Sequence, residues 1–239
     1  MFGCIIDIMM MRCWNCFTAD CKKQELSSLK QLFSVDGPIM TALGKIADFM
    51  ILSILWLVCC VPVITAGAAT AALYYVTLKM ARGEVTGVSK LFFKALKENM
   101  KAGIAFTLVF ALTGAVLCLD YTLMLQLGGA FGALLRVVFM ALGVCSLLTM
   151  LYTFPLQAQF VNTVKGTLTN AFTFALRNLR ITLLVLGVHA APLLLIFLSL
   201  ENLLKLLPLL LLLLPSVIAF VSSLLLMKVF KPMMELPAQ

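Results

Sequence analysis

The sequence predicts an all-α, polytopic membrane protein with about six transmembrane helices. Of its 239 residues, 63% are hydrophobic and 12% are charged, whereas soluble domains are about 45–50% apolar and about 25% charged. Its mean hydropathy is +1.10, and several apolar runs approach or exceed the ~20 residues that a helix needs to cross ~30 Å of hydrocarbon. No run has the alternating period of a membrane β-barrel. The expected architecture is a helical bundle whose surroundings are the lipid bilayer.

Three segments are expected along the chain. Residues 1–32 form an N-terminal extension of mixed composition, which is either disordered or belongs to a misassigned start. Residues 33–232 form the membrane domain, and residues 233–239 form a short C-terminal tail. Residues 1–11 contain Asp7 and lack both a basic start and a small-residue cleavage site, so a signal peptide is not expected there.

The first apolar region, residues 38–80, contains either one crossing or two. A proline near its middle and a run of small residues after it favour two helices, over residues 38–62 and about 65–80. With two crossings, every Lys and Arg residue except Arg136 and Lys205 falls on one side, as expected when basic loops stay in the cytoplasm. We therefore expect the first two helices to form a short hairpin, with both chain termini cytoplasmic.

The second helix of this hairpin carries the run of small residues. Small residues let two helices approach closely in lipid, where packing holds helices together. This surface serves either the hairpin within one chain or an oligomer, and the oligomeric state stays open. The expected helix-packing residues are Gly67, Ala68, Ala71 and Ala72.

Four further helices complete the predicted bundle. They cover residues 102–125, 133–160, 181–200 and 206–227. The connectors 126–132 and 201–205 are short and nearly uncharged or balanced. The other connectors are long and basic, which places them in the cytoplasm.

One of these basic connectors carries a stripe of lysines. Lys90, Lys94, Lys97 and Lys101 follow a spacing of four, three and four residues, which places them on one helical face. The spacing predicts an amphipathic cytoplasmic helix lying at the anionic inner leaflet, where each basic residue contributes about 1 kcal/mol. Two interpretations stay open, namely membrane anchoring with a topology signal, and a docking surface for an ATPase or importer subunit.

Ionisable side chains inside a membrane cost about 2.5–3.5 kcal/mol on insertion scales and are therefore candidate functional groups. The intramembrane candidates are Asp48, Asp120, Arg136 and His189. Asp120 and Arg136 flank the connector 126–132 and are expected either to pair across it or to reach the interface.

His189, the only histidine, lies about half-way along its predicted span. It acts either as a proton relay or as a hydrogen-bond partner of a neighbouring helix. The second interpretation is favoured, because a relay needs a chain of partners and only Asp120 or Asp48 is available. Asp48 itself is expected at the interface, close to Lys45.

Several function classes find no support in the sequence. The net charge of +8 arises from basic residues between apolar runs, which indicates topology signals and no nucleic-acid partner. Cys13 and Cys16 have the spacing of half a zinc site, but no second pair completes it, so neither a metal nor another cofactor is expected. Metalloprotease, serine-hydrolase and Walker motifs are absent, and the chain is not expected to be an enzyme.

Four motifs together resemble a known family. They are Trp56-Leu57-x-Cys59-x-x-Pro62, Gly67-Ala68-x-Thr70-Ala71-Ala72-Leu73-Tyr74-Tyr75, Phe92-Phe93-Lys94-Ala95-Leu96-Lys97-Glu98-Asn99, and Phe154-Pro155-Leu156 with Asn162-Thr163-x-Lys165. In these motifs the chain resembles the YesL family, also called DUF624, of bacterial membrane proteins. The resemblance extends over about residues 33–232.

The resemblance implies a bacterial inner-membrane protein that serves as an accessory or assembly factor for a carbohydrate ABC-type importer. Importer subunits are then the expected partners, and no catalytic residues are implied. Two other functions stay open. The chain could be a small secondary transporter or channel that uses Asp120, Arg136 and His189, or a membrane sensor and regulatory scaffold.

Overall fold

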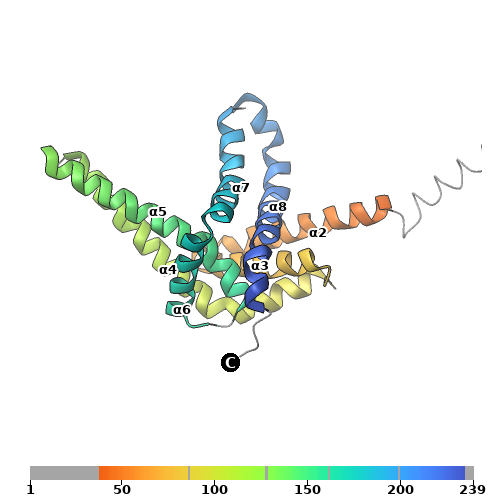
Figure 1. Cartoon of the computed structure of the whole chain (residues 1–239). Helices are drawn as coiled ribbons and strands as arrows, with labels where there is room; N and C mark the ends of the chain where they lie inside the picture. Colours follow the sequence, from red (N-terminus) through yellow and green to blue (C-terminus); the bar gives the residue numbers. More distant parts are fainter. Residues whose placement is uncertain (1–37, 86, 127–128, 161, 199, 235–239) are drawn as a thin grey trace, which may run out of the picture. The chain divides into compact units, whose positions relative to one another are not determined.

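The computed structural model describes residues 38–85, 87–126, 129–160, 162–198 and 200–234. The chain divides into two compact units, Met1–Asp48 and Phe49–Gln239. The predicted extension lies outside the described residues, and so does the predicted tail apart from Met233 and Met234. The described residues form α-helices and one 3-10 helix, which confirms the predicted all-helical class for this part of the chain (Figure 1).

Two helices separated by a short break make up the first apolar region. They are α2 (Pro38–Cys60) and α3 (Ala66–Arg82), with the 3-10 turn η1 (Val63–Thr65) before α3. Pro62 is extended, and the Thr65 hydroxyl donates to the carbonyl oxygens of Cys59 and Pro62 at 2.6 and 2.9 Å. The hydroxyl therefore satisfies a carbonyl that the end of α2 leaves without a partner. Each side of the break is long and apolar enough to cross a membrane, which confirms the predicted division into two helices.

Helices α4 (Val88–Gln126) and α5 (Gly129–Gln159) lie side by side as a hairpin (Figure 1). With 39 residues, α4 is about 58 Å long at a rise of about 1.5 Å per residue, nearly twice the ~30 Å of a hydrocarbon core. The predicted amphipathic helix is not a separate element, since its turns continue without a break into the apolar part of α4. The lysine stripe instead lies on the first turns of α4.

Three helices follow: α6 (Val164–Arg177), α7 (Leu179–Leu198) and α8 (Leu200–Met234). The α6 helix is amphipathic, since its buried residues Thr167, Ala171 and Ala175 recur every four positions. It meets α7 at a bend of 102°. The predicted connector 201–205 lies inside α8, so this boundary was wrong; its leucines and charged residues are good helix formers.

Five helical segments among the described residues are long and apolar enough to span a membrane. A sixth span results if α6 and the following Leu179–Pro192 are counted as one bent crossing. These numbers agree with the predicted bundle of about six helices. The chain is accordingly a multi-pass membrane protein.

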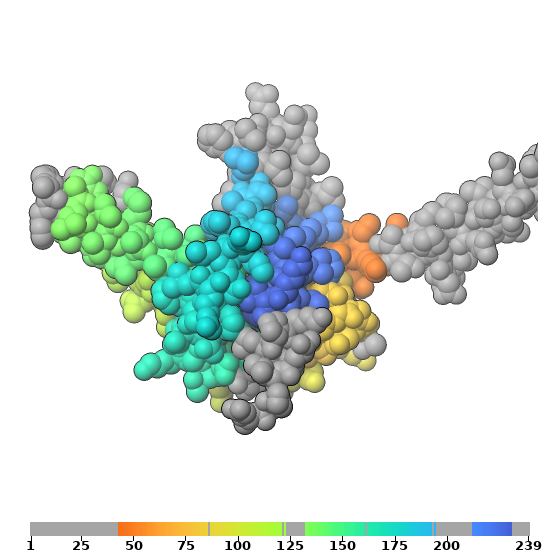
Figure 2. All heavy atoms as spheres, in the orientation of Figure 1, coloured from red at the N-terminus to blue at the C-terminus, as the bar shows by residue number. Residues whose placement is uncertain are grey.

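The core of residues 49–239 is organised around α3, which packs against α4, α5 and α8. Hydroxyl pairs join distant helices within this core. Thr77 of α3 lies 2.8 Å from Ser223 of α8, and Ser53 of α2 lies 2.7 Å from Ser216 of α8. Figure 2 shows the side chains of α7 against those of α8. These four hydroxyls are thus satisfied between helices, as a medium without water requires.

Candidate functional site

A cavity of about 810 Å³ lies between α2, α3, α4, α5, α7 and α8, within residues 49–239. It is not enclosed, and apolar side chains dominate its wall. Lining residues that define its chemistry are Trp56, Thr70, Tyr74, Phe110, Phe154 and His189. We call this space the apolar cavity. Its volume falls within the roughly 300–1,000 Å³ of typical small-molecule sites.

Hydrogen bonds within the protein engage the neutral polar groups on the α3 side of the cavity. The Trp56 Nε1–H donates to Thr70 Oγ1 at 3.2 Å, and the Thr70 hydroxyl donates to the Ala66 carbonyl at 2.8 Å. The backbone N–H of Gly67 donates to Thr107 Oγ1 at 3.0 Å, and this hydroxyl donates to a carbonyl of its own helix. Each of these donors on the cavity wall therefore already has a hydrogen-bond acceptor within the protein.

His189 is held in one orientation by hydrogen bonds from both ring nitrogens. Its Nδ1 lies 2.8 Å from the Val185 carbonyl oxygen, which can only accept, so Nδ1 carries the hydrogen. In the neutral ring, Nε2 then accepts from the Tyr74 hydroxyl at 3.3 Å. The favoured interpretation from the sequence, a hydrogen bond to a neighbouring helix, matches this contact between α7 and α3. Tyr74 itself was not predicted as a partner.

The other intramembrane candidates lie elsewhere. Asp120 is half-buried on α4, and Arg136 is exposed on α5, where its Nε–H donates to the Gly132 carbonyl at 3.3 Å. Within the described part of the chain no ion pair joins them, and their pairing across the connector stays a prediction. Neither residue lines the apolar cavity.

Asp48 is the last residue of the first unit and is half-buried, whereas Lys45 is exposed. No ion pair joins these two side chains in the residues that the structure covers. The structure therefore places Asp48 on α2 without assigning it a charged partner.

The predicted packing residues Gly67, Ala68, Ala71 and Ala72 are all buried. A methyl group added at Gly103 of α4 would collide with the backbone of Ala68, and one added at Gly67 would collide with Gly103 and Thr107. The small residues at 67 and 68 therefore face α4, whereas a hairpin contact with α2 or an oligomer surface was expected. Gly103 was missed, although a glycine in a long apolar helix is a signal for close packing.

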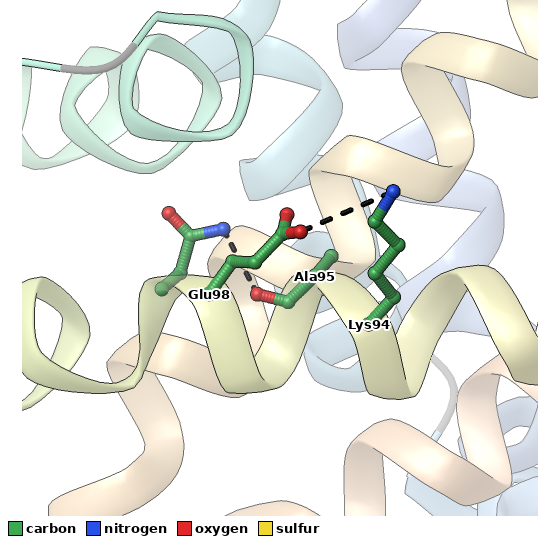
Figure 3. A network of polar contacts seen from close by, with 4 residues as sticks. Lys94, Ala95 and Glu98 are labelled. Atoms are coloured by element: carbon green, nitrogen blue, oxygen red, sulfur yellow. Dashed lines mark hydrogen bonds and ion pairs between the residues drawn. The ribbon is translucent and has the colours of Figure 1, made fainter.

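The lysine stripe lies on one side of the first turns of α4, and the opposite side of these turns is buried. Its four members, Lys90, Lys94, Lys97 and Lys101, are exposed; we call them the lysine face. On the other side, Phe92 and Ala95 are fully buried in the core. Lys94 reaches Glu98 at 4.0 Å along the helix, as Figure 3 shows.

A polar network beside the lysine face joins three helices. The Asn99 amide donates to the Ala95 carbonyl at 2.9 Å and accepts from Gln157 of α5 at 3.2 Å. Gln157 in turn accepts from the Thr167 hydroxyl of α6 at 3.3 Å. This network was not predicted from the sequence, because its members are polar residues of ordinary helices whose proximity depends on the fold. It holds the first turns of α4 in a defined position relative to α5 and α6.

The side chains that the structure describes form no metal-binding cluster. Among them, no group of three or more His, Cys, Asp or Glu residues could hold a metal ion. Cys13 and Cys16 lie outside the described residues.

Residues 49–121 match the model of a family described as "Protein of unknown function, DUF624". This match confirms the predicted resemblance to DUF624 over that region. It includes α3, the lysine face and the Gly67–Gly103 contact, whereas His189 lies beyond it. No curated protein and no solved structure matches the chain.

Proposed function

From the DUF624 match over residues 49–121, we propose that this multi-pass membrane protein is a non-enzymatic accessory or assembly factor for a carbohydrate ABC-type importer. Its partners are the importer subunits. In this proposal the protein lies in the bacterial inner membrane, with its termini and the turn between α3 and α4 in the cytoplasm. The family resemblance supports the importer connection, and the lysine face supports a docking role.

The observation that carries the docking role is the burial of the face opposite the lysines. A helix that anchors in the membrane plane places its apolar side in lipid. Here Phe92 and Ala95, on the apolar side of these turns, are fully buried against the protein core. The lysines thus form an exposed cationic surface on a helix held by the bundle, which favours binding of an acidic surface over anchoring in the membrane plane.

We expect replacement of all four lysines of the lysine face by glutamine to reduce importer capture several-fold, because the cationic surface is removed. The tagged full-length protein is purified in mild detergent, and the importer permease and ATPase subunits are quantified by mass spectrometry. A matched control removes the same charge from exposed basic residues elsewhere, namely Lys165, Arg177, Arg180 and Lys228.

The control variant is expected to retain the subunits. Equal capture by both variants would reject the lysine face as the docking surface. If the wild-type protein retains no importer subunit while the permease and ATPase stay bound to each other in the same detergent, the accessory role itself fails.

The proposed orientation predicts which end of α4 is reached from outside the cell. Glu84 lies in the exposed turn between α3 and α4, and Thr122 is exposed near the other end of α4. In a background without native cysteines, Thr122→Cys is expected to react with a membrane-impermeant thiol reagent on intact cells, whereas Glu84→Cys reacts only after lysis. Labelling of Glu84→Cys on intact cells would overturn the orientation.

Transport through a polar passage is supported less well by the geometry. Of the three side chains considered for such a passage, only His189 lines the apolar cavity. Both of its ring nitrogens are already engaged. Solute flux into proteoliposomes that is lost in His189→Ala would nevertheless establish transport.

A further inference from the structure

We propose that the apolar cavity is a binding site for an acyl chain of a membrane phospholipid. This inference goes beyond the proposed accessory role and does not depend on it. The chemistry of the cavity wall, its position along the helices and its shape all suit an acyl chain.

The wall of the cavity consists mainly of apolar side chains, and the polar groups on it are hydrogen-bonded within the protein. The Trp56 N–H, the Thr70 and Thr107 hydroxyls and the Tyr74 hydroxyl each donate within the protein. Both nitrogens of His189 are also used. The hydroxyl of Ser222 lies beside Tyr74 without meeting hydrogen-bond geometry, but it does not line the cavity.

This wall is unsuited to a sugar or an ion. A sugar hydroxyl or a charged group that enters such a site loses its water and needs new hydrogen-bond partners there. Because the donors on the wall already have acceptors, that loss would not be compensated. An acyl chain loses no hydrogen bonds on entry and gains close contacts with the aromatic and aliphatic side chains.

The cavity lies where acyl chains are the surrounding medium. Tyr74 is near the middle of the candidate span Val63–Arg82, and Phe110 and Met150 lie well inside the spans Val88–Asp120 and Gly132–Gln159. Since the cavity is not enclosed, molecules at this depth can enter it from the side. At the depth of the hydrocarbon core, those molecules are lipids.

The shape of the cavity distinguishes it from an ordinary lipid-facing surface. Its wall comes from helices on both sides, including the α4–α5 hairpin and the α7–α8 hairpin, which point in different directions in Figure 1. Phe110 and Phe154, whose ring centroids are 6.1 Å apart, lie on one side, and His189 lies on α7. A chain inserted here would be contacted from more than one side, whereas a lipid on the outer surface touches one side only.

The test uses the full-length protein in phosphatidylcholine vesicles that carry a photoactivatable diazirine on one acyl chain. After illumination, labelled peptides are located by mass spectrometry. We expect label at Met150, which lines the cavity, to exceed label at Met140, which is exposed on the same helix but does not line it. Equal or lower label at Met150 would show ordinary surface lipid only and would overturn the proposal.

Filling the cavity provides the second readout. Ala111 of α4 and Ala190 of α7 line the cavity and are exposed within it. We expect Ala111→Phe and Ala190→Phe each to lower label at Met150 several-fold. The matched controls Ala115→Phe and Ala191→Phe change exposed alanines of the same helices that do not line the cavity, and they should leave the label unchanged.

Variants are compared only if they elute as single species in detergent. Because the two lining positions lie on different helices, a folding defect in one variant leaves the other as a test. Unchanged label at Met150 in a folded lining variant would overturn the proposal. Importer capture is measured separately, so loss of the accessory role would leave this result unaffected.

Discussion

Gly103→Ala is expected to destabilise the protein strongly, although it adds only one methyl group. That methyl would collide with the Cα and N atoms of Ala68. Backbone atoms of a packed helix cannot rotate away as a flexible side chain can. The two helices would have to move apart, which would also stretch the 3.0 Å hydrogen bond from Gly67 to Thr107. Overpacking of this kind costs about 1–3 kcal/mol and occasionally more.

Gly114→Ala is the matched control, because it makes the same change on the same helix. A methyl group at Gly114 would meet nothing within 4 Å, and alanine favours a helix over glycine by up to about 1 kcal/mol. Both variants are heated in detergent, and the folded fraction is measured by size-exclusion chromatography. We expect a clear fall in the midpoint temperature for Gly103→Ala and no fall for Gly114→Ala. Equal midpoints would contradict the close α3–α4 contact.

Phe92→Ala should have the largest effect of a single truncation near the lysine face. The Phe92 side chain is fully buried, with 0% exposure, in the core that α3 and α4 share. Its removal leaves a cavity that a rigid helix pair fills only partly. Phe→Ala changes in protein cores cost about 3–5 kcal/mol. A large fall in the midpoint temperature is expected in the same heating assay.

The neighbouring residue provides the control. Phe93 is 53% exposed and contacts Phe92 edge-on, with ring centroids 5.9 Å apart. Phe93→Ala removes the same number of atoms from the outer surface and should shift the midpoint only slightly. A larger loss for Phe93→Ala than for Phe92→Ala would mean that these turns of α4 present the opposite face to the core.

The membrane-length helices and their main break could be predicted because both depend on local properties of the chain. Apolar runs of sufficient length predict spans without reference to any neighbour. The proline at position 62 has no backbone N–H, which disfavours a continuous helix there, although Pro155 and Pro192 lie inside α5 and α7. The motifs shared with DUF624 are local as well, and their match over residues 49–121 does not depend on the fold.

Helix continuity was harder to predict. Residues 88–101 have a polar face and were expected as a separate helix, yet they continue into the apolar part of α4. Residues 201–205, which interrupt the apolar run, were expected as a short connector between two spans, yet they form part of α8. In both cases a change of polarity was taken as an end of a helix. A change of polarity alone does not end a helix, because a single helix can present a polar face in one part and an apolar surface in the next.

By itself, the sequence determined the protein's class, its membrane-length helices and the family it resembles, because hydrophobic length and motif are properties of consecutive residues. It also placed His189 within a span. Only the tertiary structure decided that Tyr74, 115 positions away in the chain, is its partner, and that Gly67 and Ala68 pack against Gly103. The apolar cavity likewise exists only through the arrangement of helices. In lipid, helices associate through close packing and hydrogen bonds between particular faces, and one helix's sequence does not specify its partner.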